Sequence, residues 1–210
     1  MKRRLTAILA MDVVGYSRLI GADETGTLTI LPPFKEDMIQ PTLKHHRGRV
    51  FKLMSDGLLA EFENVVDTVR AAVETQQAVA KHNATGPEDK RIELRVGVSL
   101  DDVVFDGDDI HGDGVNVAER LKGSAEPGGI CISDIVYEGV RNRIDFLFED
   151  FGEQEFENTL HPVRVWQYRP GADATDGVPE TLPLNNCEGP DYQTWERERS
   201  TQRITKKIRL

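Results

Sequence analysis

The segment RVFKLMSDGLLAEF, residues 49–62, decides the fold that the sequence predicts. Two apolar runs flank the turn-forming residues SDG, which is the pattern of a β-hairpin with Asp56 at or beside its tip. Lys52 and Asp56 interrupt these runs, and an uncompensated charge in a half-buried hairpin is costly. The two charges therefore either point to solvent or converge on something that needs them.

The elements around this hairpin predict an α+β fold. A buried strand, RLTAILAMDVVG at 4–15, precedes the hairpin and reaches Asp12 near its end. Helical stretches interrupted by Gly21 and three prolines fill 16–46, and an amphipathic helix with Asn64 as N-cap follows at 64–83. The order strand, helix, hairpin, helix, strand is that of a ferredoxin-like sheet with helices on one face.

The second half of the chain continues the pattern. It predicts a strand at 91–100, an acidic connection at 101–114, a helix at 115–123, a short strand ending at 133, a helix at 134–144 and a terminal strand pair. After Pro170 the sequence is rich in Gly, Pro and charge and has few periodic apolar positions. We therefore expect one domain at 1–170 and a linker or disordered tail at 171–210.

Composition limits the classes of partner and compartment. The 210 residues are 39 % hydrophobic and 30 % charged, as in ordinary globular proteins, and their formal net charge is −10. That charge disfavours non-specific binding to nucleic acid or to an anionic membrane. No apolar segment approaches the roughly 20 residues that span a bilayer, and the two cysteines lack metal or redox spacing. These features predict a cytoplasmic protein.

Two aspartates mark a candidate metal site. Asp12 closes the first strand and Asp56 lies at the hairpin tip. The first strand of a ferredoxin-like sheet lies beside this hairpin, so the two carboxylates can meet at one end of the sheet. A pair of divalent cations that clamp the phosphates of a nucleotide needs such oxygen ligands. The alternative is that both are turn aspartates that cap local backbone.

The segment DDIHGDGVNVAER, residues 108–120, contains a candidate anion site. Its glycines permit a tight turn, and the N-terminus of the following helix favours an anion. Asn116 and Arg120 are four residues apart and project from one face of this helix. A neutral donor beside a guanidinium can stabilise developing negative charge on a phosphoryl group. Alternatively, Asn116 caps the first turn and Arg120 pairs with Glu119 or Glu126.

Three segments together resemble the catalytic domain of class III adenylate and guanylate cyclases, most closely the bacterial forms. They are AILAMDVVGYSRLI at 7–20, FKLMSDGLLAEF at 51–62 and RVGVSLDDVVFDGDDIHGDGVNVAERLKGSAEPGGICIS at 95–133. The resemblance runs from about Leu5 to Tyr168. Each motif alone is weak, but all three occur in the right order and at plausible spacing.

The resemblance implies a role for each candidate residue. Asp12 and Asp56 fall on the two metal-binding aspartates, which implies two Mg²⁺ or Mn²⁺ ions per site. Lys52 and Asp109 fall on the pair that selects the base, and a lysine with an aspartate favours ATP over GTP. Asn116 and Arg120 fall on the residues that orient the ribose and stabilise the transition state.

The activity implied is adenylate cyclase: ATP is converted to 3′,5′-cyclic AMP and pyrophosphate. In this family two domains pack head to tail, and each site combines the metal aspartates of one chain with the base and transition-state residues of the other. This chain carries one set of all six residues, so a homodimer with two sites is implied. The tail could lead to a sensor or effector domain.

Some positions depart from the family pattern. Ser55 replaces a usual glycine, and SLDDV at 99–103 adds negative charge near the entrance. Glu157, Asn158 or Leu160 stands where a phosphate-binding lysine is common. These departures predict a slow or weakly binding cyclase, and they motivate one rival, a nucleotide-binding, dimerising regulatory module. A second rival, a purely structural interaction domain, requires Asp12 and Asp56 to lie far apart. His111 is as well explained by a surface turn as by the base pocket.

Overall fold

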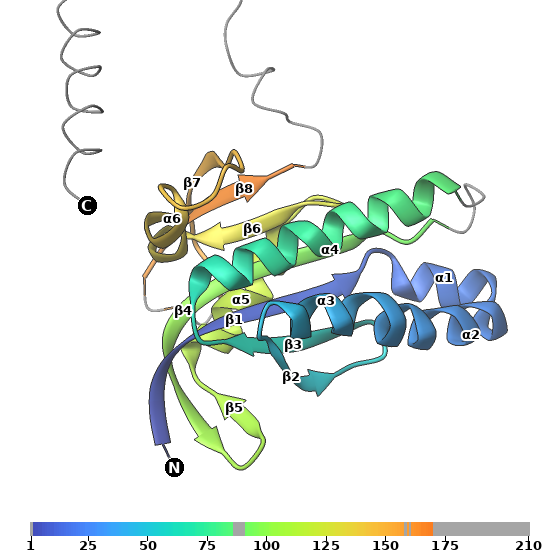
Figure 1. The fold of residues 1–210 in the computed structure, drawn as a ribbon, viewed down its shortest axis with the longest axis horizontal. Helices are drawn as coiled ribbons and strands as arrows, with labels where there is room; N and C mark the ends of the chain where they lie inside the picture. Colours follow the sequence, from blue (N-terminus) through green and yellow to red (C-terminus); the bar gives the residue numbers. More distant parts are fainter. Residues whose placement is uncertain (1, 86–90, 158, 160, 170–210) are drawn as a thin grey trace, which may run out of the picture. The chain divides into compact units, whose positions relative to one another are not determined.

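The fold is built on a single mixed sheet, seen here in a computed structural model that describes residues 2–85, 91–157, 159 and 161–169. The predicted tail at 171–210 lies outside the described residues. The strand order is β2-β3-β1-β4-β6-β8-β7, and β5 pairs with β4 (Figure 1). The strands are β1 (Lys2–Val13), β2 (Arg49–Leu53), β3 (Gly57–Phe62), β4 (Leu94–Asp106), β5 (Asp109–His111), β6 (Ile130–Ser133), β7 (Glu149–Gln154) and β8 (Val163–Tyr168).

The helices come between these strands. They are α1 (Tyr16–Ala22), α2 (Glu24–Phe34), the π-helical turn η1 (Lys35–Ile39), α3 (Gln40–His45), α4 (Val65–Thr85), α5 (Asp113–Ser124) and α6 (Asp134–Val140). The side chain of Asn64 accepts a hydrogen bond from the backbone N–H of Asp67 at 2.9 Å, so Asn64 caps α4 as predicted. Pro32 and Pro33 do not end their helix, which continues through η1 into α3.

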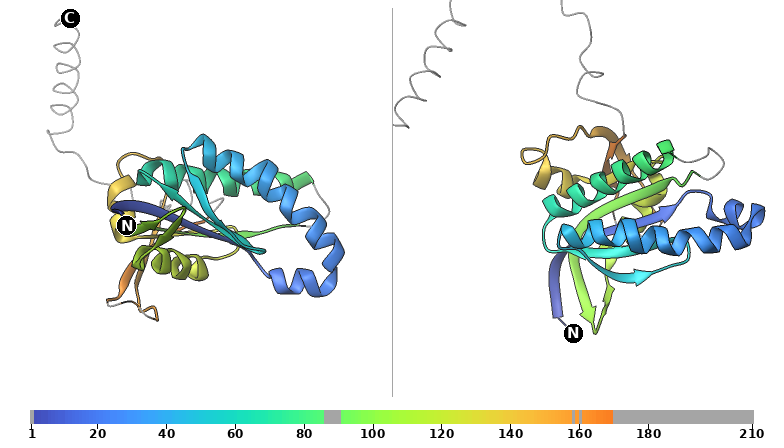
Figure 2. Two further views of the ribbon diagram at one scale, coloured as in Figure 1. Left: turned by 90° about the horizontal axis from the view of Figure 1, so that it is seen from below. Right: turned by 45° about the vertical axis from the view of Figure 1, so that its right-hand side comes forward.

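Helices cover both faces of the sheet. Along β1, Leu9 and Met11 join the apolar cluster that includes Val69 and Val73 of α4, whereas Ala10 packs on the other side with Ala118 of α5. Figure 2 shows α5 on the opposite side of the sheet from α3 and α4. The α+β class is confirmed, but the expectation of helices on one face is wrong for α5.

Close backbone contact explains where α5 packs. A Cβ atom added at Gly97 of β4 would lie 2.2 Å from the carbonyl oxygen of Ala118 and 2.2 Å from the backbone nitrogen of Lys122. Only a residue without a side chain permits this approach. Gly97 therefore allows α5 to lie directly on the centre of the sheet.

The acidic connection is the second difference from the sequence prediction. Residues 101–106 extend β4, and 101–105 pair with 2–6 in the N-terminal half of β1. The chain then turns at Gly107, whose φ is +62°, and returns as β5, with Asp106 opposite Asp109. The predicted loop is therefore a β-hairpin, and it places Asp109 at the start of β5.

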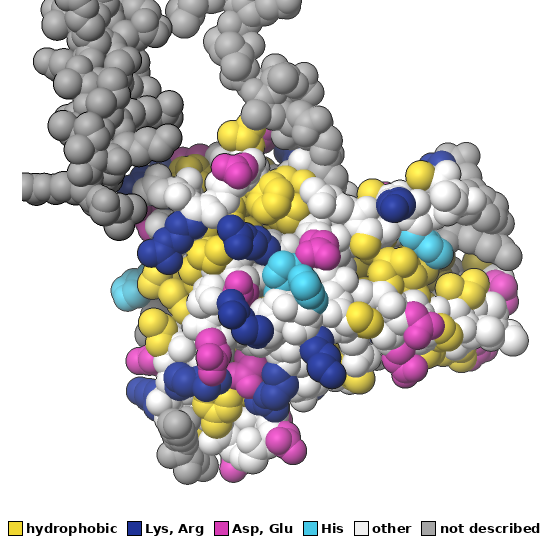
Figure 3. Space-filling model, in the orientation of Figure 1, with side chains coloured by type: hydrophobic (Ala, Val, Ile, Leu, Met, Phe, Trp, Pro, Cys, Tyr) yellow, Lys and Arg dark blue, Asp and Glu magenta, His cyan; other side chains and the backbone are white. Residues whose placement is uncertain are grey.

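The surface shown in Figure 3 carries charges of both signs. Lys and Arg side chains gather over the N-terminal half of α4 and the β2–β3 hairpin, with acidic side chains between them. Hydrophobic side chains show over α1 and α2. In the part of the chain that the structure describes, no helix is both long enough and apolar enough to cross a membrane.

Candidate active site

Asp12 on β1 and Asp56, the turn residue just before β3, are neighbours in the fold, as the sequence predicts. In the antiparallel pair of β1 and β3, Asp12 is opposite Gly57. The backbone N–H of Val13 donates to the carbonyl oxygen of Asp56 at 2.7 Å. The two aspartates therefore share one end of the sheet, so the separation that the structural-domain rival requires is not found.

Two cations already contact the carboxylate of Asp12, whose side chain is 10 % exposed. Arg95 on β4 donates to both oxygens, through Nε at 3.1 Å and Nη2 at 2.9 Å. The Nζ atom of Lys122 on α5 lies 3.5 Å from the same side chain. Such pairing offsets the cost of burying the charge. The sequence analysis missed both cations, although Arg95 was visible as a charge within the apolar run that follows Glu93.

The donor set fits a divalent cation that is shared with a substrate. Asp12 and Asp56 provide hard oxygen ligands, and the bidentate Arg95 pair leaves lone pairs of Asp12 free. Residues 2–85, 91–157, 159 and 161–169 contain no group of three or more His, Cys, Asp or Glu side chains placed to hold a metal. Mg²⁺ is commonly bound by one or two carboxylates plus substrate phosphates and water, which suits such a partial site.

A buried lysine supports the turn before Asp56. Lys35 of η1 is 7 % exposed, and its ammonium donates to the carbonyl oxygens of Met54 at 2.8 Å and Ser55 at 2.6 Å. Burial lowers the pKa of Lys35, and the nearby charge of Asp56 partly opposes this shift. Arg47 is the one non-glycine residue with positive φ in the described chain, so Ser55 carries no strain of this kind.

The predicted base-selecting residues line one open cavity. Lys52 of β2, Asp109 of β5 and Asn116 of α5 surround a space of about 410 Å³. All three side chains are exposed, so they are accessible to a ligand. His111 lines the same cavity, and its Nε2 lies 3.7 Å from Asp109, which favours the pocket over the plain surface turn. An ammonium and a carboxylate on one cavity offer a donor and an acceptor to a polar ring edge.

Arg120 lines a neighbouring cavity of about 370 Å³, which Asn116 also borders. Its guanidinium lies 3.8 Å from Glu157. The alternative partners considered for Arg120 are engaged elsewhere, since Glu119 bonds to Lys122 and Glu126 to Arg169. Among the described residues, Arg120 therefore faces an open space with Glu157 as its distant, exposed counter-charge. Glu157 is one of the three sequence positions, with Asn158 and Leu160, at which the resemblance implies a phosphate-binding lysine.

One buried group near this helix takes no part in the site. Cys131 of β6 is fully buried, and burial raises the pKa of its thiol to about 12. A thiol with this pKa is almost entirely protonated at neutral pH and is therefore a poor nucleophile. Cys131 acts as a core residue between β6 and α5.

The sheet order and these groups of side chains define an α+β domain of the class III nucleotidyl cyclase type. The chain belongs to the family of adenylate and guanylate cyclase catalytic domains, whose family model matches residues 48–168. It is 46 % identical over 170 residues to "Putative adenylate cyclase 3" of Rhizobium meliloti (strain 1021), which covers 81 % of this chain. The chain spans 29 % of the length of that relative.

Solved structures agree with this assignment. An adenylate/guanylate cyclase/hydrolase from Silicibacter pomeroyi is 41 % identical, with a TM-score of 0.76, and the match covers 82 % of this chain and all of that one. The guanylyl cyclase Cya2 has a TM-score of 0.70 over 88 % of this chain and 98 % of its own, at 21 % identity, which speaks for the fold alone.

Proposed function

We propose that this chain is an adenylate cyclase that converts ATP to 3′,5′-cyclic AMP and pyrophosphate. The observation that carries this proposal is the placement of Lys52 and Asp109 on one open cavity. Adenine presents an acceptor nitrogen beside a donor amine, which match an ammonium and a carboxylate respectively. Guanine presents the reverse pattern at the same edge, so this pair disfavours GTP.

The chain's own residues supply orientation and charge. Lys52 and Asp109 hold the base, and Asn116, between the two cavities, is placed to orient the ribose. The 3′-oxygen forms a bond to the α-phosphorus, loses its proton to solvent, and the bond from the α-phosphorus to the β-phosphate oxygen breaks. Arg120 stabilises the negative charge that develops on the phosphoryl oxygens.

Asp12 and Asp56 would hold Mg²⁺ or Mn²⁺, two ions per site. When bound, these ions acidify the attacking hydroxyl and neutralise the phosphates. We further propose that the sites form across a head-to-tail homodimer. In support, Lys52, Asp109 and Arg120 are exposed in the single chain, and neither of their cavities is lined by Asp12 or Asp56.

The deciding experiment is cyclic AMP formation from ATP and Mn²⁺ by the purified chain and by its Asp56→Ala variant. We expect activity that rises faster than linearly with protein concentration and falls at least about a hundredfold in the variant. Equal activity in the variant would contradict the metal assignment. Absence of product at every concentration would contradict the proposed activity.

Base selection has its own test. The double variant Lys52→Glu, Asp109→Cys exchanges the donor and acceptor and should move preference from ATP toward GTP by about a hundredfold or more. The ratio of kcat/KM for the two nucleotides measures this shift. An unchanged ratio would place the base elsewhere.

A second candidate is favoured by Glu157, whose carboxylate lies 3.8 Å from Arg120 and which is one of three positions where a phosphate-binding lysine is common in the family. A domain with this substitution could bind a nucleotide without turning it over and act as a dimerising regulatory module. ATP binding seen by isothermal titration with no cyclic AMP formed would support this candidate.

A further inference from the structure

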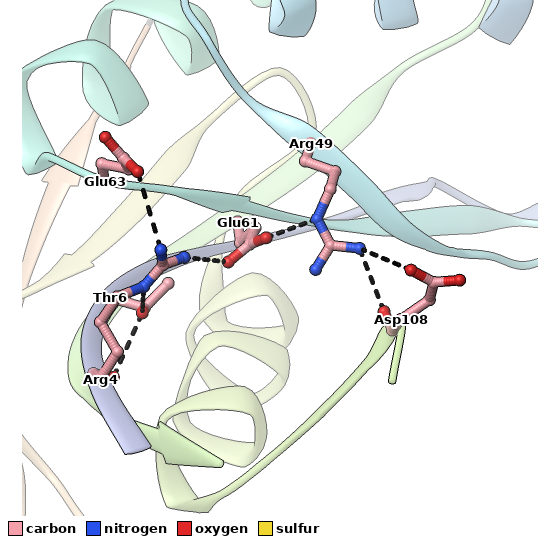
Figure 4. Close-up of polar contacts among 6 residues, drawn as sticks. All are labelled: Arg4, Thr6, Arg49, Glu61, Glu63 and Asp108. Atoms are coloured by element: carbon pink, nitrogen blue, oxygen red, sulfur yellow. Dashed lines mark hydrogen bonds and ion pairs between the residues drawn. The ribbon is translucent and has the colours of Figure 1, made fainter. Parts of the chain in front are cut away.

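A network of charged residues links three strands to the β4–β5 turn (Figure 4). Glu61 on β3 is at its centre, and the Glu61 side chain is only 9 % exposed. Arg4 of β1 donates to Oε2 of Glu61 at 2.8 Å, and Arg49 of β2 donates through Nε to Oε1 at 2.5 Å. A buried carboxylate needs such partners, and in return Glu61 fixes the orientation of both guanidinium groups.

The other end of the Arg49 guanidinium reaches the β4–β5 turn. Its Nη1 donates to the carbonyl oxygen of Asp108 at 3.2 Å and lies 4.0 Å from the Asp108 carboxylate. The carbonyl of Asp108 and the nitrogen of Asp109 belong to one planar peptide unit. Arg49 therefore holds the peptide unit that joins Asp108 to Asp109.

This contact joins the two halves of the proposed base pocket. Lys52 lies on the same strand as Arg49, and Asp109 lies on β5, which pairs only with β4. Within the described residues, Arg49 makes the only side-chain hydrogen bond or ion pair between β2 and the β4–β5 turn. Ile110 and Leu59 belong to one apolar cluster beneath this contact, but apolar packing is less directional than a hydrogen bond.

We infer that Arg49 is a positioning residue for nucleotide selectivity: bridging Glu61 and the Asp108 carbonyl, it sets the spacing between Lys52 and Asp109. This inference rests on the proposed function for its catalytic consequence. The structural component of the inference, that Arg49 holds the β4–β5 turn in place, does not depend on any nucleotide. A misplaced donor or acceptor loses more discrimination than affinity, because the correct and the incorrect base then make similar imperfect contacts.

Arg4 provides a matched control. Arg4→Met and Arg49→Met each remove one cation from Glu61, but only the second removes the contact with Asp108. Arg4 also lies over the ring of Phe105, 4.6 Å from its centroid, and methionine retains an apolar contact there. Arg49→Lys keeps the positive charge, yet a single ammonium cannot reproduce the planar fork that reaches both partners.

The test measures amide hydrogen exchange of residues 104–111 without nucleotide, and the ratio of kcat/KM for ATP and GTP. In Arg49→Met and Arg49→Lys we expect exchange of this segment to rise severalfold and the preference for ATP to fall about tenfold. Arg4→Met should change each by less than about twofold. Equal effects of Arg4→Met and Arg49→Met on both readouts would overturn the inference.

The two readouts separate this inference from the proposed function. A wild-type chain that forms no cyclic nucleotide would contradict the proposed function and, with it, the selectivity role of Arg49. The exchange comparison would then still decide whether Arg49 holds the turn. Faster exchange in Arg49→Met with an unchanged nucleotide ratio in an active enzyme would overturn the selectivity role alone.

Discussion

Lys122 is, with Arg95, one of two cations that compete with a metal for Asp12. The Lys122 side chain is 11 % exposed, and its ammonium lies 3.5 Å from the Asp12 carboxylate. Charges at this separation interact strongly when they are shielded from water. Replacing Lys122 by methionine removes the competing cation and should raise the affinity for Mn²⁺ by about tenfold. Isothermal titration of Mn²⁺ into the purified proteins measures this change without any need for turnover.

Glu119→Gln is the control for this change. Glu119 bonds to Lys122 at 2.5 Å and makes no contact with Asp12, so its neutralisation should leave Mn²⁺ affinity equal to or below that of the wild type. If Lys122→Met binds Mn²⁺ no more tightly than the wild type, the metal does not use Asp12.

At the scale of elements, η1 joins the helical segment to the hairpin. The ammonium of Lys35 donates to the carbonyl oxygens of Met54 and Ser55 in the turn. In Lys35→Met both carbonyl oxygens lose this donor and either bind water or stay unpaired. Because Ser55 is exposed and water can replace part of the loss, we expect a decrease of about 1–2 kcal/mol in the free energy of unfolding. Urea denaturation measures it.

Lys44→Met is the matched variant, since Lys44 is an exposed lysine of α3. Its free energy of unfolding should stay within about 0.5 kcal/mol of the wild type. The turn also precedes Asp56, so cyclic AMP formation should fall in Lys35→Met and not in Lys44→Met. Equal stability of the two variants would show that the turn does not need Lys35.

The first strand and the hairpin could be predicted from the sequence because local signals coincide there. The apolar run before Asp12 and the turn formers at Ser55, Asp56 and Gly57 each specify their element. The fold type then pairs β1 with β3, which brings Asp12 beside the turn that carries Asp56. The helical periodicity of 64–83 and the cap at Asn64 gave α4 within two residues of its C-terminal end.

The β4–β5 hairpin and the side of the sheet that α5 covers could not be predicted in this way. Acidic residues conceal the alternation in 101–106, and this segment is a strand because it pairs with β1. The close packing at Gly97 depends on tertiary structure. An isolated glycine in a strand pattern can equally indicate a bulge, a bend or the close approach of another backbone. The contacts of Arg49 with Asp108, of Lys35 with the turn and of Lys122 with Asp12 were missed because each joins residues that are distant in sequence.

At the scale of the whole molecule, the proposed dimer makes a prediction that no single chain can satisfy. Asp56→Ala removes a metal ligand, and Arg120→Ala removes the transition-state cation, so each variant alone should be inactive. In a head-to-tail mixed dimer, one site combines the intact aspartates of the Arg120→Ala chain with the intact Arg120 of the Asp56→Ala chain. Arg120 is exposed and Asp56 is half-buried in a turn, so neither change should prevent folding.

When equal amounts of the Asp56→Ala and Arg120→Ala chains associate at random, about half of the dimers are mixed. Each mixed dimer has one intact site of two, so about a quarter of the wild-type activity should return. Cyclic AMP formation after mixing and re-equilibration measures this recovery. A mixture of Asp56→Ala with the double variant Asp56→Ala, Arg120→Ala contains no intact site in any pairing and should stay inactive. If the first mixture also stays inactive while size-exclusion chromatography shows mixed dimers, the six residues do not form sites shared between chains.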